Sequence, residues 1–520
     1  MTINYGDIIL RLYPIYPVLL PIISAIIIAL ICRLTRNKAL LGTISSLLFL
    51  GALYIALENL WETLHTKDPI VVYYANFAPP LGSCFEIDAL SAFIATIFAL
   101  VGFAVAVYSI GYMEEEGIGN YYVLLSLLVA GLIGVAYAGD FFTLFVFYEL
   151  LGVTAYILVA FYKNREAIEA AVKYLIMGAA GSALILYGMA LIYGLTGTLN
   201  MALIAKTMKN AQLGPQLYLI LLLFLIGFGV KAAIVPMHSW LPDAHPAAPS
   251  GISAMLSGVV IKAGMYALFR TVFILFYGKD SPTGYIWNWH ISLLFAIIAI
   301  ITITLPNIIA LVQTDIKRML AYSSIYNMGI IFAGIAIGTK FAIAAALFHL
   351  LNHALAKALL FMNSGAFIMR GKTRVIEDLK GIGKKMPGTG VSFLTGCLSL
   401  AGLPPLAGFY SKFFVIWAAI LAIFDGNIIG YILAITLAIN ATVSLGYYFA
   451  VLVRKIWLVS EPSEKLGDIN EAPITVLFSE ILIATLIIAV SFLPLIVMDT
   501  ISEIVNIFVN IDAYISAVVG

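Results

Sequence analysis

Six ionisable residues lie inside long apolar segments of this chain, where water is scarce and charge is costly. They are Glu149, Lys173, Lys231, Lys262, Lys357 and Lys412. A lysine that faces lipid at the centre of a membrane costs about 3 kcal/mol, so residues of this kind usually line a hydrated interior. The chemistry that they indicate is the movement of protons, or of other small cations, along a buried path.

The segment FHLLNHALAKALLF adds two histidines to this series. His349, His353 and Lys357 follow one another at steps of four residues, which keeps their side chains on one face of a helix. Histidine titrates near neutral pH and can pass a proton through either ring nitrogen, so the three residues could form a proton relay. A polar contact between helices is the alternative. A His-x-x-x-His metal pair has no evident third ligand, and we predict no metal site.

Glu149 lies in the middle of the apolar segment FFTLFVFYELLGVTAYILVAF. It could be a structural carboxyl group that bonds a neighbouring helix, or it could pair with Lys231. A carboxylate stabilises a nearby lysine in its charged form. Moving the two groups together or apart would therefore load or release a proton at Lys231, and the two would titrate as a coupled pair.

The remaining lysines and a polar loop complete the predicted route. We expect Lys262 to lie between Lys231 and the histidines, and Lys412 to close the series. A structural role is the alternative for Lys262, and for Lys412 the alternative is a lysine that extends from a helix end to the membrane interface. A proton inlet is predicted from a separate group: Lys173, His238, Asp243 and His245. Extension to the interface is the alternative for Lys173, and a loop that stabilises the fold is the alternative for the other three.

The composition is that of a protein embedded in a membrane. Of its 520 residues, 62% are hydrophobic and 11% are charged, against about 25% charged in soluble domains. Its three cysteines are widely scattered, so we expect no iron–sulfur cluster or structural zinc site within this chain. The sequence contains no GxxxxGKS loop and no basic patch with interleaved aromatic residues, which argues against ATP hydrolysis and nucleic-acid binding.

Apolar runs of about 20 residues recur along the whole length, and each can cross a hydrocarbon core of about 30 Å. We therefore predict an all-α polytopic membrane protein with about 14 transmembrane helices. The predicted spans are 12–33, 39–58, 85–111, 121–138, 140–161, 170–195, 217–238, 247–276, 291–312, 319–338, 341–369, 391–424, 427–457 and 474–498.

Lysine and arginine are concentrated in alternate loops. The richer loops lie near residues 33–38, 163–165, 317–318, 370–385 and 454–465, whereas the other loops hold only Arg11, Lys67, Lys206, Lys209, Lys279 and Lys340. Loops rich in these residues tend to stay in the cytoplasm. We therefore predict a multi-pass membrane protein with both termini outside, which agrees with an even number of spans. We expect the membrane to be a prokaryotic cell membrane.

Two predicted spans are interrupted near a lysine. One reads IGFGVKAAIVPMHSWLP around Lys231, and the other reads LAGLPPLAGFYSKF before Lys412. Proline interrupts helical hydrogen bonding, and broken helices at matching places in two halves of a chain often mark a transport site. These are helices 7 and 12, and their spacing predicts two inverted five-helix repeats, helices 4–8 and 9–13. The predicted parts are helices 1–3 in residues 1–120, the repeats in 121–277 and 278–457, and helix 14 with a tail in 458–520.

Six strings of residues point to a known family. They are YELLGVTAYILV, GFGVKAAIVPMHSWLPDAHPAAPS, SGVVIKAGMYALFR, QTDIKRMLAYSSIYNMGI, HLLNHALAKALLFM and GLPPLAGFYSKF. Together they resemble the antiporter-like proton-translocating membrane subunits of respiratory complex I, Mrp-type sodium/proton antiporters and membrane-bound energy-converting hydrogenases. The lysine at position 412 and the short C-terminal region are most similar to the D-type Mrp subunit and its counterpart in the hydrogenase.

The resemblance implies fourteen helices with inverted repeats, and proton translocation by a Glu–Lys pair and a central polar axis. Carried over by position, Glu149 matches the essential glutamate of helix 5, Lys231 the lysine of helix 7, and Lys262 a bridging position of helix 8. The relay of helix 11 and the terminal group of helix 12 are matched by His349, His353, Lys357 and Lys412.

The predicted function is that of a proton-translocating, non-redox subunit of a larger membrane complex. Energy would arrive through partner subunits, either from electron transfer or from a sodium gradient. In a redox-driven complex those partners would hold iron–sulfur clusters and, in a hydrogenase, nickel–iron. A stand-alone sodium/proton antiporter is the alternative, although no aspartate lies at either helix break to coordinate sodium. A structural anchor with a vestigial channel is a third hypothesis, against which the full titratable series argues.

Overall fold

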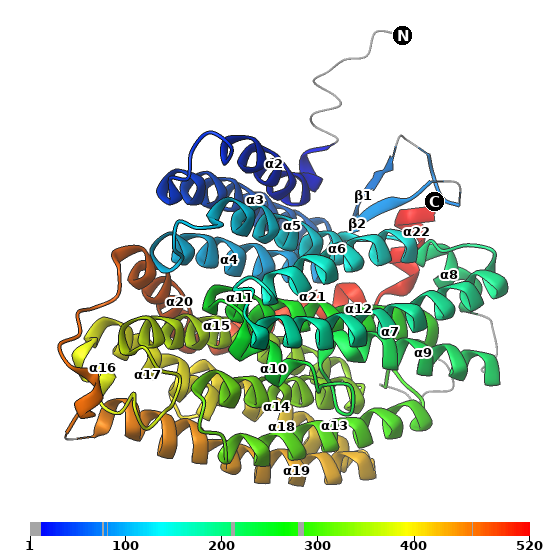
Figure 1. The fold of residues 1–520 in the computed structure, drawn as a ribbon. Coiled ribbons are helices and arrows are strands. Elements are labelled where there is room, and N and C mark those ends of the chain that lie inside the picture. The colour runs from blue at the N-terminus through cyan, green and yellow to red at the C-terminus, as the bar shows by residue number, and fades with distance from the viewer. Residues whose placement is uncertain are drawn as a thin grey trace.

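Because lipid offers no water to the backbone, a segment inside it must satisfy its own hydrogen bonds, as a helix does. The structure, a computed structural model, describes residues 12–74, 77–80, 82–209, 214–278, 285–459 and 461–519. Within these ranges 14 helices are long and apolar enough to cross a membrane. The predicted all-α polytopic architecture is therefore confirmed (Figure 1).

The spans follow one another along the chain. They are η1 with α2 (Tyr13–Ile15 and Tyr16–Ile31), α3 (Lys38–Thr66), α4 (Ala89–Tyr112), α5 (Ile118–Tyr137), α6 (Phe141–Val159), α7 (Arg165–Thr196), α9 (Pro215–Ala232), α11 with α12 (Ser250–Met255 and Ile261–Phe276), α13 (Trp289–Leu311), α14 (Ile316–Ile337), α15 (Lys340–Gly371), α18 (Ala407–Phe424), α19 with the π-helical η4 (Ile428–Leu445 and Gly446–Leu458) and α20 (Ile474–Phe492). The shorter elements are β1 (Ile70–Tyr73), β2 (Cys84–Ile87), α8 (Met201–Met208), α10 (Leu241–Ala247), α16 (Ile382–Lys385), α17 (Pro387–Ala401), α21 (Pro494–Phe508) and α22 (Ile511–Val519).

The two predicted helix breaks are present. The helix α9 ends where Ala233 adopts a φ of 53°, and α10 begins after residues 233–240. The break between α17 and α18 starts at Gly402, whose φ of 81° is a conformation that glycine adopts without steric cost. A third irregularity, which the sequence did not suggest, is a π-helical turn, η3 (Leu256–Val260), between α11 and α12. Such turns occur frequently at functional sites.

The two ends of the helix bundle carry different loops. At one end, here called the hairpin face, the antiparallel strands β1 and β2 lie near α8 and α22 (Figure 1). The opposite end, here called the basic face, includes α16 and the loops 160–164, 312–315 and 372–381. An ion pair of 3.1 Å between Arg374 and Glu166 and another of 3.3 Å between Arg374 and Asp315 join these loops.

The spans that carry most of the predicted chemistry are also the most deeply buried. The helices α12, α14 and α15 lie inside the bundle, and α15 packs against α14, α17, α18 and α20. Peripheral spans such as α3, α7 and α19 instead expose large apolar side chains. The lysines and histidines of the central helices therefore face protein and not lipid. The repeat symmetry and the boundaries between repeats remain predictions from the spacing of the breaks.

Candidate functional site: a buried series of lysines and histidines

Lys231 lies in the last turn of α9 and is 1% exposed. Its ammonium group donates a hydrogen bond of 2.9 Å to the hydroxyl of Tyr156 and lies 4.8 Å from the ring centroid of Tyr148, both on α6. Two glycines leave room for this arrangement. A Cβ on Gly152 would overlap the Lys231 ammonium group, and one on Gly178 would overlap the Tyr156 hydroxyl. Small residues and aromatic rings on α6 and α7 thus form the chamber that holds the lysine.

Glu149 is half-buried on α6, near this chamber. Its carboxylate accepts a hydrogen bond from the hydroxyl of Ser182 on α7. The carboxylate also acts electrostatically on Lys231, but the ion pairs found among the described residues do not include the two. Glu149 and Lys231 are therefore neighbours without direct contact. Of the two arrangements that the sequence suggested, with the groups together or apart, the structure has them apart.

Lys262 is fully buried on α12. Its ammonium group donates to the backbone oxygen of Ser257 in the π-helical turn of the same span. The hydroxyl of Ser257 is hydrogen-bonded at 2.7 Å to that of Ser324 on α14. On its other side α12 closely approaches the end of α9, because a Cβ on Gly264 would lie only 2.6 Å from the backbone nitrogen of Ala232. Lys262 therefore belongs to a helix that contacts both α9 and α14.

His349 and His353 lie on one face of α15 and are fully buried. The Nδ1 of His349 is 2.9 Å from the hydroxyl of Ser411 on α18, and its Nε2 is 3.2 Å from Oδ1 of Asn327 on α14. The ring centroids of the two histidines are 6.2 Å apart. Neither ring nitrogen of His353 has a hydrogen-bond partner among the described residues. His353 is therefore free to bond to water in this polar stretch.

Lys357 and Lys412 are held mainly by backbone carbonyl and hydroxyl oxygens. Lys357 donates to the backbone oxygen of Leu320 at 2.8 Å and to the hydroxyl of Ser323. Lys412 donates to the backbone oxygen of Leu400 at 2.6 Å and to the hydroxyl of Ser444 at 3.0 Å. The carbonyl of Leu400 lies at the end of α17, where helical hydrogen bonding stops and oxygens are left free. The break in span twelve therefore supplies a hydrogen-bond acceptor for the lysine of that span.

Polar side chains of α14 connect these groups, and the sequence reasoning did not assign them. Ser323 contacts Lys357, Ser324 contacts the turn that holds Lys262, and Asn327 contacts His349. Their signal in the sequence was a run of polar residues at steps of three and four within an apolar span. Tyr156 was also missed, because an aromatic residue among apolar ones is indistinguishable from ordinary packing.

The four residues predicted as an inlet lie in three places. Lys173 and Asp243 form an ion pair of 3.0 Å at the basic face and help to line a polar cavity there. His245 is fully buried, stacks on Phe361 with ring centroids 4.5 Å apart, and has no hydrogen-bond partner for either ring nitrogen among the described residues. His238 is half-buried in the break after α9. In the described part of the chain, no three His, Cys, Asp or Glu residues are placed to hold a metal ion.

Comparison with known proteins gives consistent matches over most of the length. Residues 138–439 match the family model described as "NADH:quinone oxidoreductase/Mrp antiporter, TM", and residues 79–122 match the N-terminal model of complex I chain 5. The chain is 34% identical over 448 residues to the N subunit of NADH-quinone oxidoreductase of Desulforudis audaxviator, which covers 84% of this chain and 85% of that protein. It is 30% identical over 406 residues to a Na(+)/H(+) antiporter subunit of Bacillus subtilis, of the D type, which covers 77% and 79%.

A solved structure gives the same result for the fold. A chain of the membrane-bound sulfane sulfur reductase, an archaeal respiratory membrane complex, superposes with a TM-score of 0.86 at 30% identity. The match covers 97% of this chain and 99% of that chain. The likeness therefore extends over nearly all of both chains.

The contact between Lys231 and Tyr156 gives a testable prediction. Tyr156→Phe keeps the ring but removes the oxygen that accepts the lysine's hydrogen bond, a loss of about 1 kcal/mol. We expect proton transport by the assembled complex to slow several-fold. Tyr187→Phe on α7, where the side chain is 54% exposed, is the matched control and should leave transport unchanged. Equal transport rates in the two variants would show that the Tyr156 hydroxyl plays no part.

Proposed function

Because the chain belongs to the NADH:quinone oxidoreductase/Mrp antiporter family, we propose that it carries protons across the membrane along its buried lysines and histidines. It is an antiporter-like subunit that lies among other membrane subunits of a multisubunit complex. The relatives support this assignment, since they are subunits of NADH-quinone oxidoreductases, a subunit of a Na(+)/H(+) antiporter and a chain of a respiratory membrane complex.

The observation that carries the proposal is a set of buried ammonium groups without carboxylate partners. Lys231, Lys262, Lys357 and Lys412 are at most 6% exposed, and none of them forms an ion pair within the described residues. An unpaired buried charge costs several kcal/mol and does not stabilise a fold. Their partners are largely carbonyl and hydroxyl oxygens. A hydroxyl can both donate and accept, so it can serve a lysine in either protonation state.

The proposed route begins at the polar cavity of the basic face, beside Lys173 and Asp243. A proton would pass to Lys231, which lies near the carboxylate of Glu149. It would continue through Lys262 and the α14 hydroxyls to the histidines of α15, and then to Lys412. Buried water would bridge the gaps between these groups, as it commonly does between buried polar atoms.

We propose that the energy source lies in partner subunits, as electron transfer or a sodium gradient. The three cysteines of this chain are distributed over the loop before α3, β2 and α17, which supports placing any iron–sulfur or nickel–iron centre in the partners. The visible absorption of the intact complex separates the two sources. Bleachable iron–sulfur bands indicate a redox-driven complex, and a colourless complex of membrane subunits indicates an antiporter of the Mrp type.

We further propose that the hairpin face is the outer one, with both termini outside, because lysine and arginine gather on the basic face. In a Cys32→Ser background, an impermeant thiol reagent added to right-side-out vesicles should label Lys206→Cys on α8. It should leave Lys384→Cys on α16 unlabelled until the membrane is opened. The reverse pattern would place the basic face outside.

The main test of the proposed function removes the charges of the first chamber. Glu149→Ala or Lys231→Ala should abolish proton translocation by the complex in proteoliposomes, with subunit composition largely retained, because the proposed mechanism loads the proton at Lys231 through the electrostatic coupling of the two groups. Lys206→Ala, which removes an exposed lysine of α8, is the control and should be fully active. Normal translocation in both Glu149→Ala and Lys231→Ala would contradict the proposal.

A further inference from the structure

The helix that carries Lys262 continues toward the hairpin face with two further polar residues on the same side. Lys262, Tyr266 and Arg270 follow at steps of four along α12, so they share one face and extend over about 12 Å. All three are buried, with exposures of 0%, 3% and 1%. The guanidinium carbon of Arg270 lies 6.0 Å from the ring centroid of Tyr266. A polar line therefore leads from the central lysine toward the hairpin face.

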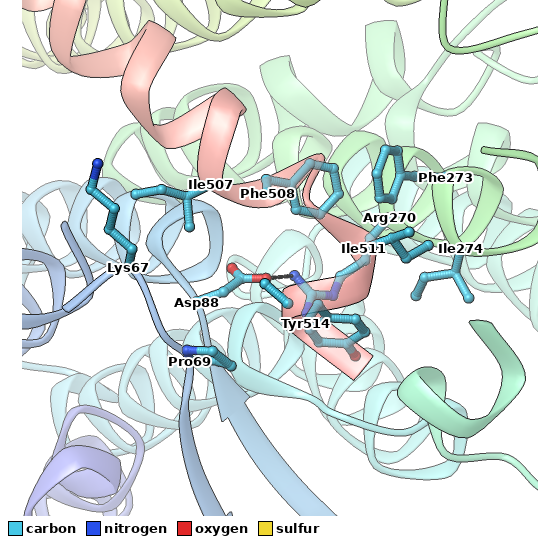
Figure 2. A pocket seen from close by; sticks show the side chains of 11 residues that line it. Lys67, Pro69, Asp88, Arg270, Phe273, Ile274, Ile507, Phe508, Ile511 and Tyr514 are labelled. Carbon is cyan, nitrogen blue, oxygen red and sulfur yellow. Dashed lines mark hydrogen bonds and ion pairs between the residues drawn. The ribbon is translucent and has the colours of Figure 1, made fainter. Parts of the chain in front are cut away.

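At the end of this line Arg270 meets a pocket of the hairpin face. Its Nη1 lies 2.6 Å from Oδ2 of Asp88, which caps α4. Figure 2 shows this pair facing the pocket, with Tyr514 of α22 beside it and Lys67 at the opposite edge. The Nε of Arg270 and the hydroxyl of Thr271 are buried without a hydrogen-bond partner among the described residues. Polar groups of this kind are commonly satisfied by buried water.

Glu86 on β2 is hydrogen-bonded to Tyr514, which lines this pocket. It is fully buried, accepts hydrogen bonds from Nδ2 of Asn200 at 3.2 Å and from Sγ of Cys84 at 3.3 Å, and also accepts one from the hydroxyl of Tyr514. Burial raises the pKa of the Glu86 carboxyl group to about 7, although the hydrogen bond from Tyr514 and the charge of Arg270 act in the opposite direction. A group of this kind exchanges protons readily near neutral pH.

We propose that Glu86 is the last proton carrier of an outlet that leads from Lys262 past Tyr266 and Arg270 to the pocket of the hairpin face. This inference rests on the proposed function and adds to it an exit that leads from Lys262 to the hairpin face. The Lys262 ammonium group gives its proton through water to the Glu86 carboxylate and becomes a neutral amine. Glu86 then releases the proton to the water of the pocket beside Tyr514.

Arg270 has a positioning role in this outlet and does not carry the proton, since its guanidinium group stays charged in proteins. A fixed positive charge inside a narrow polar passage opposes the return of a cation. Its pair with Asp88 also joins α12 to the start of α4. The titratable and charged groups that act on Glu86 are Tyr73, Cys84, Tyr266, Arg270 and Tyr514. Two further carboxylates contact members of this set, Asp140 at the backbone of Cys84 and Asp88 at Arg270.

The test measures proton translocation by the reconstituted complex while the pH on the hairpin side is varied. In the unaltered complex we expect the rate to fall as that pH drops through about 7, because Glu86 then remains protonated and accepts no further proton. Glu86→Gln should slow translocation about tenfold or more and abolish this pH dependence. Glu503→Gln on α21, where the carboxylate is exposed and pairs with exposed Lys67 at 2.8 Å, is the control and should behave as the unaltered complex.

Tyr514→Phe is a second variant, which keeps the aromatic ring at position 514 of α22. It provides a test even if the complex that carries Glu86→Gln fails to assemble. It removes a hydroxyl that stabilises the carboxylate, so the midpoint of the pH dependence should move upward. If Glu86 and Tyr514 only held the fold together, both variants would lower thermal stability but leave the rate per assembled complex and its pH profile unchanged. That result would overturn the outlet. If Lys231→Ala is inactive while Glu86→Gln is normal, only the outlet fails; if Lys231→Ala is also normal, the proposed function fails.

Discussion

The burial of lysine ammonium groups among backbone carbonyls and hydroxyls, without carboxylates in contact, is the constraint on which the rest of this structure depends. A charged group that leaves water must recover its lost hydrogen bonds, or it is expelled or neutralised. A carbonyl inside a regular helix already accepts one backbone hydrogen bond and has one further lone pair to offer, as Leu320 of α14 does to Lys357, whereas a helix break leaves carbonyl oxygens without their backbone donors. The broken span and the π-helical turn provide such oxygens at Leu400 and Ser257, beside Lys412 and Lys262. The irregular backbone and the buried charge therefore explain each other.

The same constraint explains which features were predictable from the sequence. The fourteen helices follow from apolar length, and the breaks follow from glycine and proline next to Lys231 and Lys412. The residue types of the central series were evident as well, because charge inside an apolar segment is rare. The π-helical turn at Leu256–Val260 was not evident, since it has no glycine or proline signature distinct from an ordinary helix.

Contacts between helices that are distant in the sequence were also out of reach of sequence reasoning. The serines and the asparagine of α14 gain their importance only because the π-helical turn η3 and α15 both contact that helix. Arg270 lies eight residues beyond Lys262, but its partner Asp88 is 182 positions away in the chain. Glu149 and Lys231 lie near each other without an ion pair, and the hydroxyl partner that each finds on another helix, Ser182 and Tyr156, was not identified from the sequence.

Lys262 lies where the proposed inlet, the histidine relay of α15 and the outlet toward the hairpin face all meet. The most direct test of the account is therefore proton flux through the native complex carrying Lys262→Gln, reconstituted in proteoliposomes and normalised to assembled complex. Glutamine fits a similar space and can still bond to the Ser257 carbonyl, but it cannot take up and release a proton. The account predicts loss of proton flux with subunit composition retained. Full flux through Lys262→Gln would contradict it.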